Sequence, residues 1–353
     1  MTALRREWHG AAEIMVTVDG AQVRALAYPA LTGSPRVGDR VLLNTAALDR
    51  GLGTGGYAFV VAIPDRLPDD VPETGHIVKS RYTPQQVMVA SVEEQGSPHH
   101  ELLREADSID GMPVVVADLH SALPAILAGV FASAGTDGSF PVRVCYIMQD
   151  GGALPAWFSR TVAGLRAAGW LAATVTTGQS FGGDLEAVTV HAGLLAARHV
   201  AGAEVAVVAQ GPGNLGTGTR WGFSGVAAGE AVNAAAALGG RPVASLRLSA
   251  ADQRSRHQGV SHHSLTAYGR VALAACDVVV PGLPEPLASQ VAAGVAPLAA
   301  RHRLVTVPTG GLESALRACP VPLSTMGRGL DDDLAYFLAA AAAGRHAAGL
   351  LAS

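Results

Sequence analysis

Lysine and cysteine are scarce in this chain, and each scarcity excludes a class of site. Lys79 is the single lysine among 353 residues. A phosphate-binding loop of the pattern GxxxxGK[ST] is therefore excluded, since Lys79 follows no such glycine run. A pyridoxal-phosphate Schiff base would have to form on Lys79, in a stretch without a supporting pattern, so we expect no such cofactor. The three cysteines, Cys145, Cys276 and Cys319, are scattered, which excludes a disulfide framework and a CxxC zinc site.

Basic runs and long uninterrupted apolar runs are also missing. The net charge is −4 and no cationic cluster runs along the chain, so we expect no nucleic-acid partner. No signal-peptide pattern follows the N-terminus, and Gly344, Arg345 and His346 interrupt the Ala-rich tail, so we expect no membrane partner and a cytoplasmic location. Hydrophobic residues make up 49% of the chain, which is enough for a large core.

The first 95 residues are patterned as β-structure. Two alternating runs, AEIMVTV and AQVRALAY, flank Asp19-Gly20, a dipeptide typical of a two-residue hairpin turn. The stretches GDRVLLN and YAFVVAI are further strand-like runs, and no helical period appears. We predict a small β-barrel-like domain over 1–95, followed by a linker over 96–112.

From residue 113 to 353, short β-branched runs alternate with longer Ala- and Leu-rich segments. Runs that are apolar on both faces, each followed by a helical segment, are typical of a parallel sheet covered on both sides. About seven such βα units predict a doubly wound α/β domain. A (β/α)8 barrel is the alternative, but no eighth strand is found. The predicted strands are 114–119, 142–148, 171–177, 203–209, 242–248, 277–282 and 303–309.

Glycine clusters and unusual polar residues follow these strands. Because ligands bind beyond the carboxyl ends of parallel strands, we expect a site at that edge of the sheet. The stretch QGPGNLGTGTRW, residues 210–221, precedes a predicted helix and suits a phosphate or carboxylate; the alternative is a loop that only permits close packing. The predicted anion-binding residues of this loop are Gly211, Gly213, Asn214, Gly216, Thr217, Gly218, Thr219 and Arg220.

The stretch SAADQRSRHQGVSHHS, residues 249–264, concentrates titratable groups. Ser261 has the position of a helix N-cap, which places His262 and His263 in a first turn, where the helix dipole favours neutral imidazole. Neutral imidazole serves either as a metal ligand or as a general base. His257 approaches from the preceding loop, and Asp252 is placed to orient a histidine. We predict that these four residues take part in catalysis.

A second group of side chains joins this stretch if the fifth predicted strand lies beside the first. The candidate metal ligands are then Asp118, His120, His262 and His263. A set of His and Asp ligands suits zinc, manganese or iron. Three uses stay open: a divalent-metal site, acid–base histidines without a metal, or an anion site in which Arg254 and Arg256 pair with substrate charge.

Acidic residues follow another glycine pair in TTGQSFGGDLE, residues 176–186. Gly182-Gly183 are predicted to lead into a helix whose first turn carries Asp184 and Glu186. Acids in a first turn often only stabilise the helix dipole. The alternative is that Glu186 acts in catalysis.

Several stretches together resemble an uncharacterised bacterial family, domain-of-unknown-function family 3866. The matching pieces span nearly the full length and are GDRVLLNTAALDRGLGTGGYAFV, GHIVKSRYTPQQ, EEQGSPHH, TTGQSFGGDLEAV, AQGPGNLGTGTRWGFSG and RHQGVSHHSLTA. The resemblance implies a full-length member of that family, and it brings no activity, cofactor or catalytic residue with it.

These observations lead to a first hypothesis and two alternatives. The first is an enzyme, a hydrolase or group transferase, that acts on a small anionic, phosphorylated or nucleotide-like substrate with the His/Asp cluster, with or without a divalent metal. The second is a sensor that binds a nucleotide or small ligand without catalysis. The third is an NAD(P)-dependent oxidoreductase, which is weakened because no acid for a ribose follows the glycine loop. Ala- and Gly-rich helices can pack closely, which leaves a homo-oligomer open.

Overall fold

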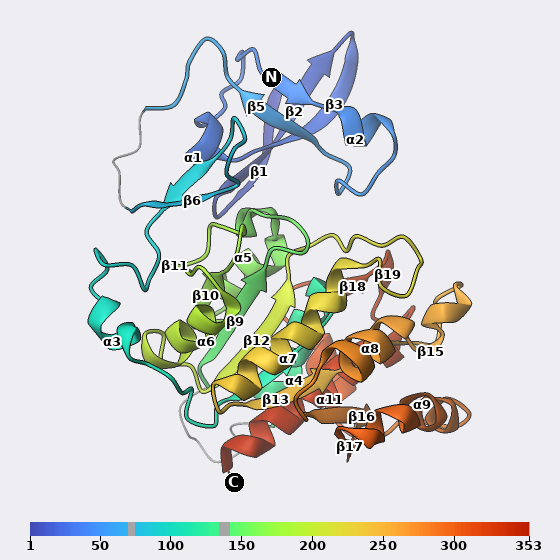
Figure 1. The fold of residues 1–353 in the computed structure, drawn as a ribbon. Coiled ribbons are helices and arrows are strands. Elements are labelled where there is room, and N and C mark those ends of the chain that lie inside the picture. Colours follow the sequence, from blue (N-terminus) through green and yellow to red (C-terminus); the bar gives the residue numbers. More distant parts are fainter. Residues whose placement is uncertain (70–74, 134–141, 353) are drawn as a thin grey trace.

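The computed structural model describes residues 1–69, 75–133 and 142–352. A small N-terminal sheet lies above one edge of a larger α/β domain (Figure 1). Trp157 joins the two parts. Its carbonyl accepts a hydrogen bond of 2.6 Å from Trp8 Nε1, and its indole lies against Gly10 and Tyr28. The edge beneath the small sheet is the carboxyl edge of the large one, since Trp157 closely follows its strand β9 (Val144–Gln149).

The N-terminal sheet is open. Its strand order is β1-β2-β3-β5-β4, and only β3 and β5 are parallel neighbours. Asp19 and Gly20 both have positive φ and join β2 to β3, as the hairpin prediction requires. The barrel-like closure is not confirmed, because β1 and β4 remain edge strands in the described residues. The bounds are β1 (Ala3–Trp8), β2 (Ala11–Val18), β3 (Ala21–Ala27), β4 (Leu42–Asn44), β5 (Ala58–Ala62), α1 (Pro29–Thr32) and α2 (Ala46–Asp49).

The chain then passes from the small sheet to the large domain along its outer edge. A short hairpin of β6 (Ile77–Lys79) and β7 (Val87–Val89) comes first. The predicted linker contains a short helix, α3 (His100–Arg104). Val92 N donates to the carbonyl of Glu186 in the large sheet, so this segment is bound to the α/β domain before its first strand begins.

Lys79 fastens this segment to the large domain. Its side chain is fully buried, and Nζ lies 2.8 Å from Glu186 Oε2. The ammonium also donates to the carbonyl oxygens of Thr176, Ser180 and Ala187 at 2.7–3.2 Å. The single lysine of the chain is therefore an anchor between two segments about a hundred residues apart.

The large sheet has eight parallel strands in the order β11-β10-β9-β12-β8-β13-β16-β17. Each of the seven predicted runs overlaps one of them, because a strand buried on both faces needs a continuous apolar run. The eighth, β11, was missed; it has two residues, too few for a periodic pattern. The bounds are β8 (Pro113–Val116), β9 (Val144–Gln149), β10 (Ala173–Thr176), β11 (Leu185–Glu186), β12 (Val205–Gln210), β13 (Arg241–Ser245), β16 (Asp277–Pro281) and β17 (Arg303–Val307).

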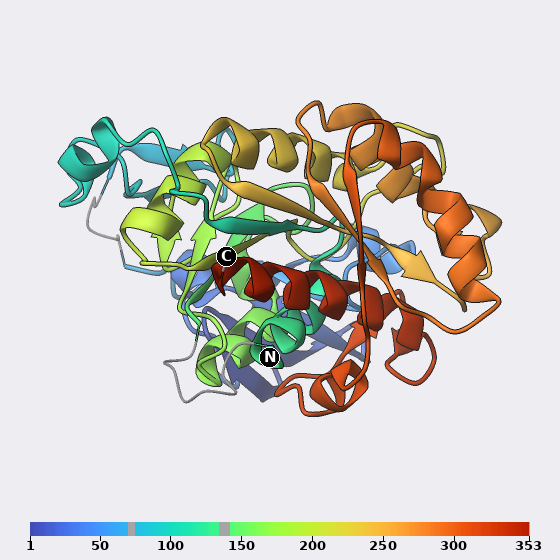
Figure 2. The same ribbon diagram turned by 90° about the horizontal axis from the view of Figure 1, so that it is seen from below.

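Helices cover both faces of this sheet (Figure 2). One face packs against α4 (Leu123–Phe131), α5 (Arg160–Ala167), α10 (Leu312–Arg317) and α11 (Leu334–Gly349). The other packs against α6 (Val190–His199), α7 (Ala227–Ala237), α9 (Leu287–Val295) and a π-helical turn at Ala267–Val271, which continues α8 (His262–Thr266). Between the two layers, β9 and β12 are buried at every position. The helix predicted to carry Asp184 and Glu186 in its first turn begins later than expected, at Val190, with Thr189 as its N-cap.

The C-terminal helix belongs to the core. The span Leu334–Ala352 is long and apolar enough to cross a membrane, but 61% of its most apolar stretch is buried inside the molecule. It packs against α4 at two glycines. A Cβ on Gly129 would lie 1.8 Å from the carbonyl oxygen of Ala341, and one on Gly344 would lie 1.9 Å from that of Ile126. Only glycine allows these two helix backbones to approach so closely.

Candidate functional site at the carboxyl edge

The centre of the sheet brings three unusual segments together. β8 lies between β12 and β13, so the segments that follow these strands emerge side by side. The segment after β8 carries Asp118, the one after β12 is the glycine loop, and the one after β13 carries Arg247 and the histidine-rich stretch. The condition on which the sequence prediction depended, that the fifth strand lies beside the first, is met.

Three histidines form a cluster at the start of α8. Ser261 is the N-cap, as predicted, and its Oγ accepts a hydrogen bond of 3.2 Å from His263 N. The ring centroids of His257, His262 and His263 lie 4.5–5.1 Å from one another. One ring nitrogen of each lies within 4.8 Å of the other two. Phe223 stacks on the ring of His263 with 3.7 Å between centroids, which limits the orientation of that ring.

Two of the three histidines, His257 and His262, are held in the neutral form. Burial, and then the charges of Arg247 and Arg254, lower the pKa of His257 to about 3. Burial, and then the neighbouring His263, lower the pKa of His262 to about 4. Both rings keep a free nitrogen lone pair at neutral pH, which is what a metal ligand needs.

Each ring is oriented by a different partner. His257 Nδ1 lies 2.7 Å from Ser261 Oγ, which leaves its Nε2 for another group. His263 Nδ1 lies 3.3 Å from Asp118 Oδ2 and 2.9 Å from Arg247 Nη1. Nδ1 donates to the carboxylate when it carries a hydrogen and accepts from the guanidinium when it does not. His262 Nε2 is buried and has no hydrogen-bond partner among the described residues.

Asp118 is a buried carboxylate beneath the cluster. Its side chain is 5% exposed, as is that of Arg247, and Oδ2 lies 3.6 Å from Arg247 Nη1. Burial by itself would raise the pKa of the Asp118 carboxyl. The hydrogen bond to His263 and the charge of Arg247 outweigh burial and hold the pKa below its usual value. Asp118 is therefore ionised at neutral pH, next to a histidine ring nitrogen.

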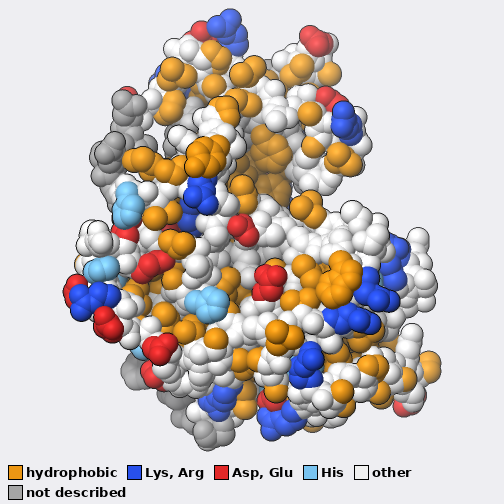
Figure 3. Space-filling model, in the orientation of Figure 1, with side chains coloured by type: hydrophobic (Ala, Val, Ile, Leu, Met, Phe, Trp, Pro, Cys, Tyr) orange, Lys and Arg blue, Asp and Glu red, His pale blue; other side chains and the backbone are white. Residues whose placement is uncertain are grey.

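A pocket of about 670 Å³ opens beside the cluster. His262 lines it together with Gly218, Arg220, Arg256 and Arg270. The three arginines are exposed, and none has an acidic partner among the residues that the structure describes. Figure 3 shows arginine side chains gathered on this flank of the large domain, next to a hydrophobic side chain. The pocket thus combines one histidine of the cluster with three unpaired positive charges.

The glycine loop contributes less than predicted. Its tip folds back as a hairpin, in which Thr217 N donates to the carbonyl of Gly222 and the Thr219 hydroxyl accepts from Gly222 N. Asn214 Oδ1 accepts from Gln210 Nε2 at 2.9 Å, so it supports the base of the loop. Of the eight predicted residues, Gly218 and Arg220 line the pocket. Gly211 packs against Ala153, and neither Gly213 nor Gly216 lines the pocket.

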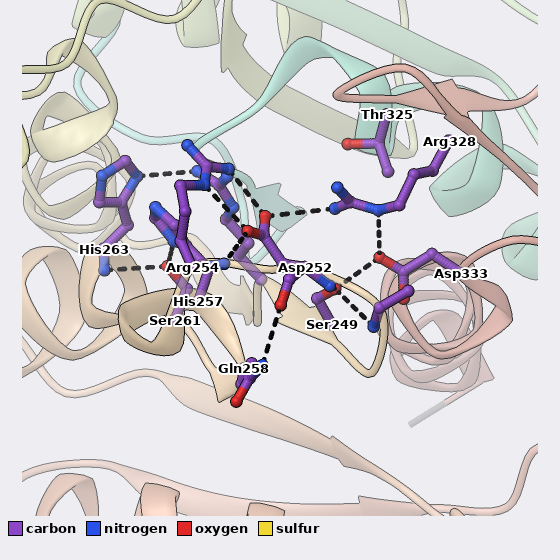
Figure 4. Close-up of polar contacts among 12 residues, drawn as sticks. Ser249, Asp252, Arg254, His257, Gln258, Ser261, His263, Thr325, Arg328 and Asp333 are labelled. Atoms are coloured by element: carbon purple, nitrogen blue, oxygen red, sulfur yellow. Dashed lines mark hydrogen bonds and ion pairs between the residues drawn. The ribbon is translucent and has the colours of Figure 1, made fainter.

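Asp252 belongs to an ion-pair network with two arginines (Figure 4). Its carboxylate accepts from Arg254 Nε and Nη2 at 2.9 and 2.7 Å, and Arg328 Nη2 lies 3.3 Å away. Arg328 in turn contacts Asp333. The described structure gives Asp252 no hydrogen bond to a histidine, so it does not orient one as predicted. Arg254 is occupied by Asp252, and Arg256 alone of the two predicted arginines faces the pocket.

Two further predicted residues lie outside the cluster. His120 is buried between Tyr146 OH (3.0 Å) and Ser159 Oγ (2.8 Å), so both ring nitrogens are engaged elsewhere. Glu186 is in strand β11, and the prediction of a helix first turn there is wrong. Its carboxylate binds Lys79 and accepts from Thr176 Oγ1 at 2.7 Å. Of the predicted metal set, the structure brings together Asp118, His262 and His263, and adds His257 in place of His120.

Sequence reasoning missed three residues that contact the histidine cluster or line its pocket. Arg247 lies inside the apolar run 242–248, where a charged residue is unusual, and that position was a usable signal. Arg270 follows His262 and His263 by eight and seven residues, the helical spacing of a shared face. Phe223 carries no signal of its own, since its contact with His263 depends on how the glycine hairpin folds back.

The fold and the site define an α/β protein with a histidine cluster at the carboxyl edge of its parallel sheet. The family model described as "Protein of unknown function (DUF3866)" matches residues 24–344. The chain belongs to this family. No curated protein and no solved structure matches the chain significantly.

Proposed function

We propose that the protein is a divalent-metal-dependent hydrolase or group transferase that acts on a small phosphorylated substrate. The observation that carries this proposal is the position of His262. Its buried Nε2 has no hydrogen-bond partner in the described structure. His262 belongs to the histidine cluster and also lines the arginine pocket. A buried nitrogen without a hydrogen bond is costly, and a metal ion would remove that cost.

The donor set fits a zinc ion. Three histidine ring nitrogens would leave one coordination position for water, which is the usual arrangement of a catalytic zinc site. Asp118 and Ser261 contact the Nδ1 atoms of His263 and His257, as outer partners of metal-ligating histidines do. When bound, the ion would supply a hydroxide at neutral pH and polarise a phosphoryl oxygen. Manganese or iron is an alternative occupant.

The residues of the chain would do the remaining work. Arg220, Arg256 and Arg270 would hold the anionic oxygens of the substrate, because guanidinium groups match phosphate geometry and stay charged. Phe223 and Asp118 would keep His263 in one orientation while the substrate binds. Transfer of the phosphoryl group to water, which is hydrolysis, and its transfer to another acceptor use the same arrangement of residues.

Elemental analysis of tag-free protein is the first test, with His262→Ala/His263→Ala as the variant and the exposed His9→Ala/His191→Ala as the matched control. We expect about one zinc per chain in the parent and control, and its loss in the variant. The zinc-loaded parent should hydrolyse p-nitrophenyl phosphate, and the rate of hydrolysis should decrease when the zinc is removed. No metal after incubation with zinc, manganese or iron would refute the proposal. Metal binding without turnover of phosphate esters would favour the non-catalytic sensor.

A further inference from the structure

A second positively charged pocket lies between the N-terminal sheet and the large domain. Its volume is about 420 Å³, within the range of small-molecule sites. Four arginines line it: Arg5 and Arg6 from β1, Arg24 from β3 and Arg160 from α5. None of them has an acidic partner among the described residues. β1 runs from the small sheet towards α5, so both domains contribute (Figure 1).

Local backbone features direct two of these side chains into the pocket. Consecutive residues of a regular strand point to opposite faces of the sheet. The pairing of β1 with β2 shifts between Leu4 and Arg6, which marks a β-bulge at Arg5. A bulge re-aims side chains, and bulges occur preferentially beside functional sites. Arg5 and Arg6 both line the pocket in consequence.

Of the other two arginines, Arg24 lies over a buried tyrosine, and Arg160 lines the same pocket. The Arg24 guanidinium carbon lies 5.1 Å from the centre of the Tyr57 ring. A Cβ on Gly56 would lie 2.6 Å from Arg24 Nη2, so the glycine makes room for this arginine. Tyr57 OH donates to the buried Glu13 at 2.9 Å. Arg160 opens helix α5, where the positive end of the helix dipole disfavours a cation.

The lining therefore carries four guanidinium groups against the single carboxylate of Glu13, a net charge of +3 in a protein whose net charge is −4. Holding four cations near one carboxylate leaves excess positive charge, which costs free energy, and a polyanion offsets that cost. Guanidinium forks bind phosphate oxygens in a bidentate manner. We propose that this pocket binds a small molecule through a diphosphate group. The inference does not depend on the proposed function of the histidine cluster.

Calorimetric titration with inorganic pyrophosphate tests the inference on the full chain. Arg24→Ala/Arg160→Ala removes two charge-assisted contacts, and we expect the pyrophosphate Kd to rise at least about 100-fold. The matched control is Arg36→Ala/Arg50→Ala, which removes the same charge from the N-terminal part outside the pocket. It should change the Kd less than about twofold, as screened distant charges do.

Three outcomes would overturn the proposal. The first is the absence of pyrophosphate binding to the parent chain. The second is equal weakening in the variant and the control, which would indicate general charge attraction. The third is binding that survives Arg24→Ala/Arg160→Ala but is lost in Arg220→Ala/Arg256→Ala, which would place the anion at the histidine site. If the first variant fails to fold, Arg5→Ala/Arg6→Ala on the exposed edge strand provides the same comparison.

Discussion

Replacement of Lys79 by methionine should destabilise the protein far more than the loss of an exposed ion pair. Methionine keeps most of the side-chain volume but removes the ammonium, which is 0% exposed and bonded to a carboxylate and three carbonyl oxygens. Removing one partner of a buried ion pair costs about 3–5 kcal/mol. Glu186 keeps its hydrogen bonds from Thr176 Oγ1 and Gly182 N, which favours the lower half of that range.

The assay is urea unfolding followed by tryptophan fluorescence, with Arg40→Met as the matched control. Arg40 and Asp65 form an ion pair whose side chains are 74% and 62% exposed, so its loss should cost at most about 1 kcal/mol. The double variant Lys79→Met/Glu186→Gln should be more stable than Lys79→Met, because no carboxylate is left without its partner. A cost for Lys79→Met no larger than that of the control would refute the anchoring argument.

Three further predictions concern the core, the ion-pair network and the metal site. Gly344→Ala should lower the free energy of unfolding by about 1–3 kcal/mol in urea titrations, since the methyl group meets a backbone carbonyl, whereas Gly349→Ala in the same helix should not destabilise. Asp252→Asn should cost about 2 kcal/mol at neutral pH. The hydrogen bonds from Arg254 lower the pKa of the Asp252 carboxyl. The contribution of Asp252 to the free energy of unfolding is therefore fully present above about pH 4, the pKa in the unfolded chain, and is lost as the pH falls through the lower pKa of the folded protein. Equal costs of Asp252→Asn at neutral and strongly acidic pH would contradict this. Asp118→Asn should weaken zinc binding about 10- to 100-fold in a chelator competition, and an unchanged affinity would remove its orienting role.

The sequence predicted those parts of the fold that depend on local pattern. The hairpin at Asp19-Gly20 follows from the backbone freedom of that dipeptide, and Ser261 was recognisable as an N-cap before two histidines. The buried strands were recognisable because each needs an unbroken apolar run. β11 was not, since its two residues pair with β10 only after the intervening loop has folded. The structure brings the three predicted histidines together, whereas His120 and Asp252 are bonded to other side chains.

The sequence by itself determined which residues lie at the carboxyl edge of the large sheet. Apolar runs fix where the strands end, and in this chain histidines, arginines and glycines follow those ends. Only the tertiary structure decided which side chains meet. Asp252 has two arginines within reach and so pairs with Arg254 and Arg328, while Asp118 reaches His263 because β8 and β13 are neighbours. Strand order and ion pairing depend on competition among partners far apart in the chain, and no local pattern records the outcome of that competition.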